Sequence, residues 1–251
     1  MGGGRYRLNA VELSASQGVT LDLGPLAGED VGGATPKKRK TPHAIQPNPT
    51  HLKIVTLTNK KLRFRNPIEP SFIVEWAHRL YSPDTHVISL TGGEPLFQPE
   101  FLVSTVESLK NEGFKLYLET NGSMPTHVAR ISHSLDYCCC DIKDESAGAA
   151  ENWRKLVDLE LETIKILSDA GVAVFAKVVV TSKTKPENIE WYSRELSKIN
   201  CPMCIQPVTP KNGYRSPSFQ QLRAFTETAA RHLGSENVSL SIQVHKFLGI
   251  P

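Results

Sequence analysis

The sequence lacks several features that would assign it to a class of protein at once. No stretch approaches the roughly 18 to 20 consecutive apolar residues of a membrane span, so we expect a soluble protein. The first residues, MGGGRYRLNA, contain no apolar core or cleavage site of an export signal, and we expect a cytoplasmic location. The formal net charge of +3 is too small to indicate a nucleic acid or a membrane surface as a partner.

Cysteine is also scarce. Five cysteines among 251 residues do not make a disulfide scaffold, and none precedes Cys138. Cys138, Cys139 and Cys140 are consecutive in a predicted strand, where side chains alternate between faces, so the three cannot converge on one cluster. Cys201 and Cys204 form one C-x2-C pair, which alone is weak evidence for a zinc site. We expect Cys138, Cys140 and Cys204 to be small buried hydrophobic residues.

The segment from residue 18 to residue 66 shows little sustained periodicity. Its basic run, KKRK at 37–40, lies among Pro, Gly, Thr and Asn residues, and we interpret it as a solvated loop. One strand is expected at LKIVTLT, residues 52–58. We therefore divide the chain into residues 1–66, with a first strand and an irregular segment, and residues 67–251, with a regular fold.

From Asn66 onward, short apolar runs alternate with amphipathic segments. This alternation predicts repeated βα units with a parallel sheet, and about six units favour an open, partial βα barrel over a closed one. Proline is common in the first turn of a helix, so helices are expected to begin near Pro99 and Pro186. Glycine is common just after a helix, so helices are expected to end before Gly113 and Gly171. Strands are expected at 86–91, 115–120, 136–142, 172–180, 203–208 and 238–244, and helices near 71–81, 99–112, 126–133, 151–170, 186–198 and 217–233.

Polar residues stand at the end of every predicted strand. In a parallel βα sheet, ligands bind at the carboxyl ends of the strands. A turn or capping role explains Thr120, Thr181 or Ser182 taken singly, but it is a weaker explanation for six consecutive strand ends. The strand-end groups are Thr91–Glu94, Glu119–Gly122, Asp141–Lys143, Thr181–Ser182, Gln206–Pro207 and His245–Lys246.

The stretch TGGEPL, residues 91–96, follows the first of these strands. It resembles the GGE motif of radical S-adenosylmethionine (SAM) enzymes, in which the glycine backbone and the glutamate receive the amino group of SAM. The chemistry agrees, because glycine allows close approach of the backbone and a carboxylate pairs with an ammonium.

Further segments narrow the resemblance to one family. The order of these segments across residues 66–251 is similar to that in 7-carboxy-7-deazaguanine synthases. LNAVELSASQG, near the start, resembles that family's first strand and substrate loop, although Val19 stands where the family has a glutamate. The matching segments are ISLTGGEPL, LYLETNG, CDIK, FAKVVVT, CIQPVTP and IQVHKFLGIP.

The resemblance implies a reaction and its ligands. Members of that family cleave SAM with a four-iron four-sulfur cluster, and the resulting radical abstracts hydrogen from 6-carboxy-5,6,7,8-tetrahydropterin. The pterin ring contracts with loss of ammonia, so the resemblance implies a carbon-nitrogen lyase of queuosine-type 7-deazapurine biosynthesis. The implied cofactors are SAM, the cluster and magnesium. The implied assembly is a homodimer that binds a small pterin and neither nucleic acid nor membrane.

The resemblance also assigns roles to residues of this sequence. Gly92, Gly93 and Glu94 would hold the SAM ammonium, and Asp141, Lys143 and Gln206 would hold its ribose and carboxylate. The residues expected to contact the pterin are Gln17, Glu119, Thr120, Gly122, His245 and Pro251, the last through a terminal carboxylate. The apolar or stiff residues of FLGIP favour docking of that terminus over fraying.

One part of the family pattern is missing. The cluster requires cysteines spaced C-x3-C-x2-C after the first strand, followed by an aspartate and a threonine that helps to place magnesium, and residues 19–65 contain neither feature. Three explanations are compatible with the sequence. Residues 19–65 come from a misread frame or a mis-spliced gene model; the chain is a cluster-free relative that binds pterin, SAM or a partner; or it is an unrelated barrel enzyme using Glu94, Lys143 and His245 in acid–base catalysis.

Overall fold

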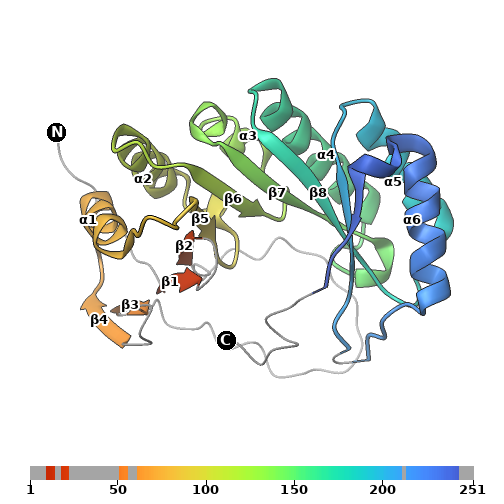
Figure 1. Cartoon of the computed structure of the whole chain (residues 1–251), viewed down its shortest axis with the longest axis horizontal. Coiled ribbons are helices and arrows are strands. Elements are labelled where there is room, and N and C mark those ends of the chain that lie inside the picture. The colour runs from red at the N-terminus through yellow and green to blue at the C-terminus, as the bar shows by residue number, and fades with distance from the viewer. Residues whose placement is uncertain (1–9, 15–17, 23–50, 56–60, 211–212, 243–251) are drawn as a thin grey trace. The chain divides into compact units, whose positions relative to one another are not determined.

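The computed structural model describes residues 10–14, 18–22, 51–55, 61–210 and 213–242 (Figure 1). The chain divides into two compact units, Met1–Thr120 with Arg130–Tyr137, and Asn121–Ala129 with Cys138–Pro251. None of the helices within the described ranges is long and apolar enough to cross a membrane. The predicted boundary between residues 66 and 67 stays a prediction.

The first unit contains a mixed sheet with the strand order β4-β3-β1-β2-β5-β6. β2, β5 and β6 are parallel, β1 is parallel to β3, and the pairs β1/β2 and β3/β4 are antiparallel. The strands are β1 (Ala10–Ser14), β2 (Gly18–Asp22), β3 (His51–Val55), β4 (Lys61–Arg65), β5 (Val87–Thr91) and β6 (Leu116–Thr120). The helical segments are α1 (Pro70–Leu80), η1 (Pro95–Phe97), α2 (Pro99–Asn111) and η2 (Ser132–Ser134).

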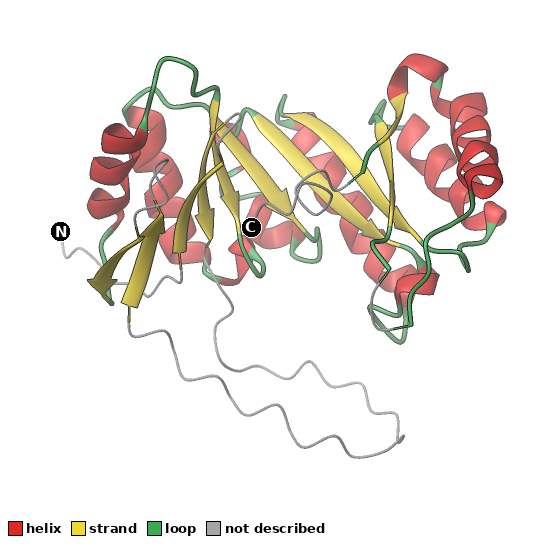
Figure 2. Cartoon of the chain, turned by 60° about the horizontal axis from the view of Figure 1, so that its bottom comes forward, coloured by secondary structure: helices red, strands yellow, loops and turns green. Residues whose placement is uncertain are grey.

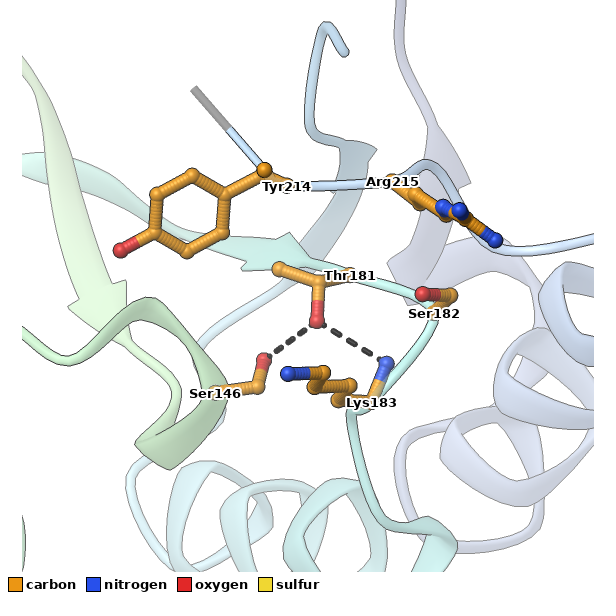
Figure 3. Close-up of a pocket in the computed structure, with 7 residues that line it drawn as sticks. Ser146, Thr181, Ser182, Lys183, Tyr214 and Arg215 are labelled. Carbon is orange, nitrogen blue, oxygen red and sulfur yellow. Dashed lines mark hydrogen bonds between the residues drawn. The ribbon is translucent and has the colours of Figure 1, made fainter. Parts of the chain in front are cut away.

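The second unit has the strand order β7-β8-β9-β10, and β8, β9 and β10 are parallel. Its strands are β7 (Tyr137–Lys143), whose first residue belongs to the first unit, β8 (Ala173–Val180), β9 (Met203–Pro207) and β10 (Val238–Leu240). The helical segments are α3 (Pro125–Val128), η3 (Glu145–Ala147), α4 (Trp153–Asp169), α5 (Pro186–Ser197), α6 (Phe219–Leu233) and η4 (Ser235–Asn237). Immediately after β8, the Thr181 hydroxyl bonds to Ser146 (Figure 3).

Within each unit the helices lie along one side of the strands (Figure 2). This arrangement follows from the sequence pattern, because each amphipathic helix must bury its apolar stripe against a sheet. In α1 the buried residues Ile73, Trp76, Ala77 and Leu80 recur at helical spacing, and in β5 the buried residues alternate with half-exposed ones. In the described part of the chain, no helix covers the opposite side of either group of strands (Figure 2).

The predicted α/β fold with six parallel strands, β5 to β10, and an open sheet is confirmed. Pro99 and Pro186 begin α2 and α5, and Gly113 and Gly171 follow helices with positive φ, as expected. The expected helix at 126–133 was wrong: α3 ends at Val128, and a separate turn, η2, follows. Its serines favour turns over helix interiors, because their hydroxyls compete for backbone hydrogen bonds.

Candidate functional site

Glu94 follows β5 and is the residue immediately before the η1 turn. Its side chain is buried, and Oε1 accepts hydrogen bonds from the Leu96 backbone N–H at 3.1 Å and from the Thr120 hydroxyl at 2.7 Å. Gly92 has φ of 144°, a region that favours glycine, and both Gly92 and Gly93 are exposed. The result is a fixed carboxylate beside open backbone, an arrangement suited to an ammonium group. The bond from the Leu96 N–H also caps η1, which is the structural explanation for Glu94.

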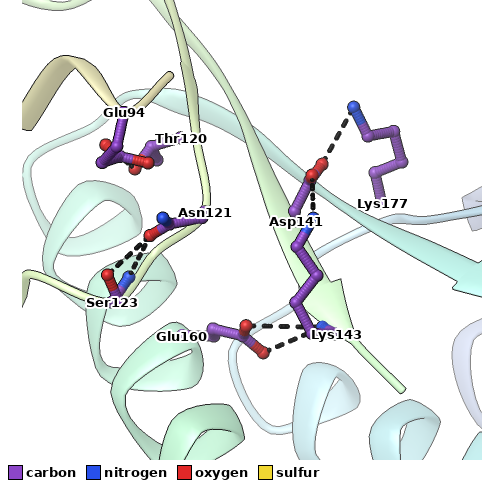
Figure 4. A network of polar contacts seen from close by, with 8 residues as sticks. All are labelled: Glu94, Thr120, Asn121, Ser123, Asp141, Lys143, Glu160 and Lys177. Atoms are coloured by element: carbon purple, nitrogen blue, oxygen red, sulfur yellow. Dashed lines mark hydrogen bonds and ion pairs between the residues drawn. The ribbon is translucent and has the colours of Figure 1, made fainter. Parts of the chain in front are cut away.

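A charged triad occupies the end of β7 in the second unit (Figure 4). Asp141 Oδ1 pairs with Lys177 Nζ at 2.8 Å, and Asp141 Oδ2 pairs with Lys143 Nζ at 2.5 Å. All three side chains are between 21% and 27% exposed, so solvent screens the charges only in part. One carboxylate between two ammonium groups leaves a net positive charge, which suits an anionic ligand group such as a carboxylate.

Lys177 is the third member of this triad, and it is not among the residues that the resemblance assigns to SAM or the pterin. It lies on β8, where alternate residues are buried, and its register partner on β9 is Cys204. The sequence separation between Lys177 and Asp141 hides the pairing, because it depends on which strands are neighbours. Gln206, also on β9, is half-buried and pairs in register with Val179.

Beneath the triad, a second carboxyl group supports the backbone. Glu160 of α4 is fully buried, and its two oxygens accept hydrogen bonds from the Lys143 backbone N–H at 3.1 and 3.3 Å. Burial raises the pKa of Glu160 to about 8, against the lowering effect of the Lys143 N–H. A signal for this residue existed in the sequence, because Glu160 stands at helical spacing from Val157, Ile164 and Leu167 on the apolar face.

Gly122 was predicted to face the pterin. Close packing around this position also explains why a glycine stands there. Its φ is 70°, and a Cβ atom there would lie 2.6 Å from Cys140 Sγ and 3.1 Å from the Glu160 Cα. The Thr163 hydroxyl donates to the Gly122 carbonyl at 2.8 Å. The turn after β6 is therefore fixed against α4 and β7.

The other predicted pterin contacts divide into three groups. Glu119 is half-buried near the end of β6. Thr120 is buried and donates to Glu94, so its placement supports that carboxylate. Gln17, His245 and Pro251 lie outside the described residues.

The cysteines do not fit an iron–sulfur cluster. All five are buried free thiols, and Cys138, Cys140 and Cys204 are buried as predicted. Burial raises the pKa of Cys201 to about 12, and burial likewise raises that of Cys140, whereas a cluster requires thiolates. Across the described ranges, no group of three His, Cys, Asp or Glu side chains is arranged to hold a metal ion.

Comparison with known proteins gives the family. No family profile matches the chain. The 7-carboxy-7-deazaguanine synthase of Thermococcus kodakarensis is 44% identical over 185 residues, which cover 74% of this chain and 71% of that protein. This chain belongs to the 7-carboxy-7-deazaguanine synthase family. The Methanocaldococcus jannaschii synthase is 36% identical, covering 71% of this chain and 73% of the relative. The hypothesis of an unrelated barrel enzyme is therefore wrong.

Solved structures of similar fold agree with the fold of this chain. Streptococcus suis SuiB bound to S-adenosylmethionine superposes with a TM-score of 0.56 at 13% identity, covering 71% of this chain and 44% of SuiB. A radical SAM methyltransferase from Sphaerobacter thermophilus gives a TM-score of 0.50 at 17% identity, covering 72% of this chain and 59% of the methyltransferase. At these identities the likeness concerns the fold, an open radical SAM barrel.

Proposed function

We propose that this member of the 7-carboxy-7-deazaguanine synthase family binds SAM and a pterin without cleaving SAM reductively. One observation carries the proposal: the polar groups at the strand ends are present and hydrogen-bonded, while the sequence contains no set of cysteines that could ligate a cluster. Reductive cleavage of SAM needs an electron from that cluster. Ligand binding by the strand ends does not.

Glu94, Gly92 and Gly93 would receive the methionine amino group of SAM. The carboxylate of Glu94 is already held by two donors, so little conformational freedom is lost when it accepts from an ammonium. The triad of Asp141, Lys143 and Lys177 would accept the SAM carboxylate on its lysines, with Asp141 orienting both ammonium groups. Gln206 would bond to the ribose.

By the family resemblance, Glu119 would contact the pterin, because a carboxylate suits the amino and ring N–H donors of a pterin. Gly122 of the second unit is expected to contact it as well, and it lies in a buried turn of fixed shape. Three further pterin contacts are expected from the sequence resemblance alone: Gln17, His245 and Pro251.

Calorimetry of SAM binding tests this proposal. Glu94→Gln removes the charge with little change in shape, and we expect at least tenfold weaker binding, because a hydrogen bond to a charged group contributes about 1.5 to 3 kcal/mol. Glu107→Gln is the matched control, since Glu107 is exposed on α2 of the same unit. Equal affinities of the parent protein and Glu94→Gln would remove Glu94 from the site, and absence of SAM binding by the parent would overturn the proposal.

A designed cluster loop separates binding from radical chemistry. Residues 23–50, which lie between β2 and β3, are replaced by a segment that carries C-x3-C-x2-C and the following aspartate and threonine. We expect the replaced protein to assemble a cluster and to form 5'-deoxyadenosine and 7-carboxy-7-deazaguanine, and the parent to form neither. Product formation by the parent would refute the proposal. A replaced protein that holds its cluster but binds no SAM would show that the barrel does not carry the family site.

A second candidate concerns the gene. Family-like sequence stands on both sides of residues 19–65, at Gln17–Gly18 and from Asn66 onward, which favours a misread frame or mis-spliced model and hence an active synthase at this locus. Reading the coding nucleotides between codons 18 and 66 decides it. A C-x3-C-x2-C motif in another frame supports this candidate, and its absence from all frames supports the cluster-free protein.

A further inference from the structure

A polar cavity lies in the second unit, beyond the end of β8. Its volume is about 620 Å³. Figure 3 shows Tyr214 and Arg215 on one wall, Ser146 and Lys183 on the opposite wall, and Thr181 and Ser182 between them. None of these residues is among those proposed to hold SAM or the pterin. We propose that this cavity binds a phosphate monoester, with Lys183 and Arg215 as its cationic contacts.

The walls of the cavity are held in place by hydrogen bonds. The Tyr214 hydroxyl donates to the Ala147 carbonyl at 2.9 Å, and the Ser182 backbone N–H donates to the Arg215 carbonyl at 2.8 Å. Gln221 of α6 donates to the Ser182 carbonyl at 3.1 Å. The loop that carries Tyr214 and Arg215 is thus tied to η3 on one side and to the end of β8 on the other. A ligand would meet a surface that is already formed, which lowers the entropy cost of binding.

A chain of hydroxyl groups forms the floor, and its direction can be assigned. Thr184 donates to the carboxylate of Asp144 at 2.8 Å, which uses its only hydroxyl hydrogen. Ser146 must therefore be the donor in its 3.0 Å contact with Thr184, and Thr181 donates to Ser146 at 2.8 Å. All three hydrogens point toward buried Asp144. Among the side chains of the described lining, the donors that remain for a ligand are Lys183, Arg215 and the Ser182 hydroxyl.

The charge of the cavity favours an anion. Lys183 and Arg215 are the charged residues of the described lining, and neither forms an ion pair with any described residue. Lys185, only two residues from Lys183, is by contrast paired with Glu145 at 2.8 Å. Asp144, the buried carboxylate at the end of the hydroxyl chain, accepts hydrogen bonds from the Ser146 N–H and from the side chains of Thr184, Asn188 and Tyr192.

Phosphate fits this set of donors better than a carboxylate does. The planar guanidinium of Arg215 can donate two parallel hydrogen bonds to phosphate oxygens, and Lys183 adds a second positive charge to the lining of the cavity. The cavity is larger than a phosphate ion, and the exposed ring of Tyr214 provides apolar surface for the organic part of the ligand. A phosphorylated small molecule therefore fits better than free phosphate alone.

Binding is measured by calorimetry at low ionic strength with inorganic phosphate, glucose 6-phosphate, glucose and acetate as probes. We expect saturable binding of inorganic phosphate, tighter binding of glucose 6-phosphate, and none of glucose. Lys183→Gln and Arg215→Gln should each weaken phosphate binding about tenfold or more, as expected for loss of a charge-assisted contact. Lys185→Gln, which removes the same charge from a neighbouring paired lysine, should change it less than threefold.

Three results would overturn the assignment. Acetate binding as tightly as phosphate would mean that the cavity does not select a phosphate group. Equal losses in Lys183→Gln and Lys185→Gln would mean that general positive charge, and not this cavity, attracts the anion. Phosphate binding that does not saturate would exclude a site. All three substituted side chains are exposed, and unchanged urea unfolding of each variant checks that the fold is retained.

Discussion

The titration of Glu160 should make the stability of the second unit depend on pH. Burial raises its pKa from 4.5 to about 8, so the folded protein holds a proton on Glu160 that the unfolded chain releases above pH 4.5. The stabilisation from this proton is fully present below pH 4.5, falls as the pH rises, and is lost above about pH 8. At about 1.4 kcal/mol for each pKa unit, the loss amounts to about 5 kcal/mol.

The substitution Glu160→Gln isolates this effect. The amide oxygen of glutamine can still accept from the Lys143 N–H, and the side chain never becomes charged. We expect parent and variant to have similar free energies of unfolding at pH 5, and the variant to be more stable by several kcal/mol at pH 9. Urea unfolding followed by circular dichroism between pH 5 and pH 9 measures the difference.

The control for this experiment lies on the same helix. Glu162 is exposed on α4, and Glu162→Gln should leave the pH profile of unfolding parallel to that of the parent. The reasoning is refuted if Glu160→Gln also gives a parallel profile, because Glu160 would then titrate at the same pH in the folded and unfolded states.

Three further predictions concern packing, a buried carboxylate and metal content. Gly122→Ala should destabilise the protein by about 2 to 4 kcal/mol in urea unfolding, because it adds a clash with Cys140 to an unfavourable φ. Gly113→Ala has a similar φ with no atom near the new Cβ, and should cost only about 1 kcal/mol. Asp144→Asn should cost about 3 kcal/mol, since four donors converge on that carboxylate; a cost below about 1 kcal/mol would contradict this account. Anaerobic reconstitution should leave no stable cluster, and a stoichiometric four-iron signal in iron and sulfide analysis with paramagnetic resonance would contradict this.

The sequence was sufficient to predict most of the described barrel. Five of the six predicted parallel strands, β5 to β9, lie within a residue of their expected bounds, because buried strands and amphipathic helices leave different periodicities. β10 ends earlier than expected, at Leu240. β2 and β4 were not predicted. In β4 exposed Lys61, Arg63 and Arg65 alternate with half-buried residues, and five residues are too few to distinguish this from chance.

The candidate site was less predictable than the fold. Glu94 could be proposed as a ligand-binding residue because its glycine neighbours form a recognisable local motif. Lys177 and Arg215 could not be assigned in this way, because their roles depend on contacts between strands and loops that are distant in sequence. The type of residue alone does not give its surroundings either. Glu160 and Glu162 are both glutamates of α4, but Glu160 is buried and Glu162 is exposed.

The charges on β4 bear on how two copies of this chain could associate. β4 is the last strand at one edge of the described sheet, and such an edge can pair with another strand. Two copies that joined antiparallel through β4 would place Lys61, Arg63 and Arg65 of one strand against the same residues of the other. Like charges directly opposite one another destabilise a strand pair. The edge is therefore protected against sheet extension, and a homodimer of this protein should use a different surface.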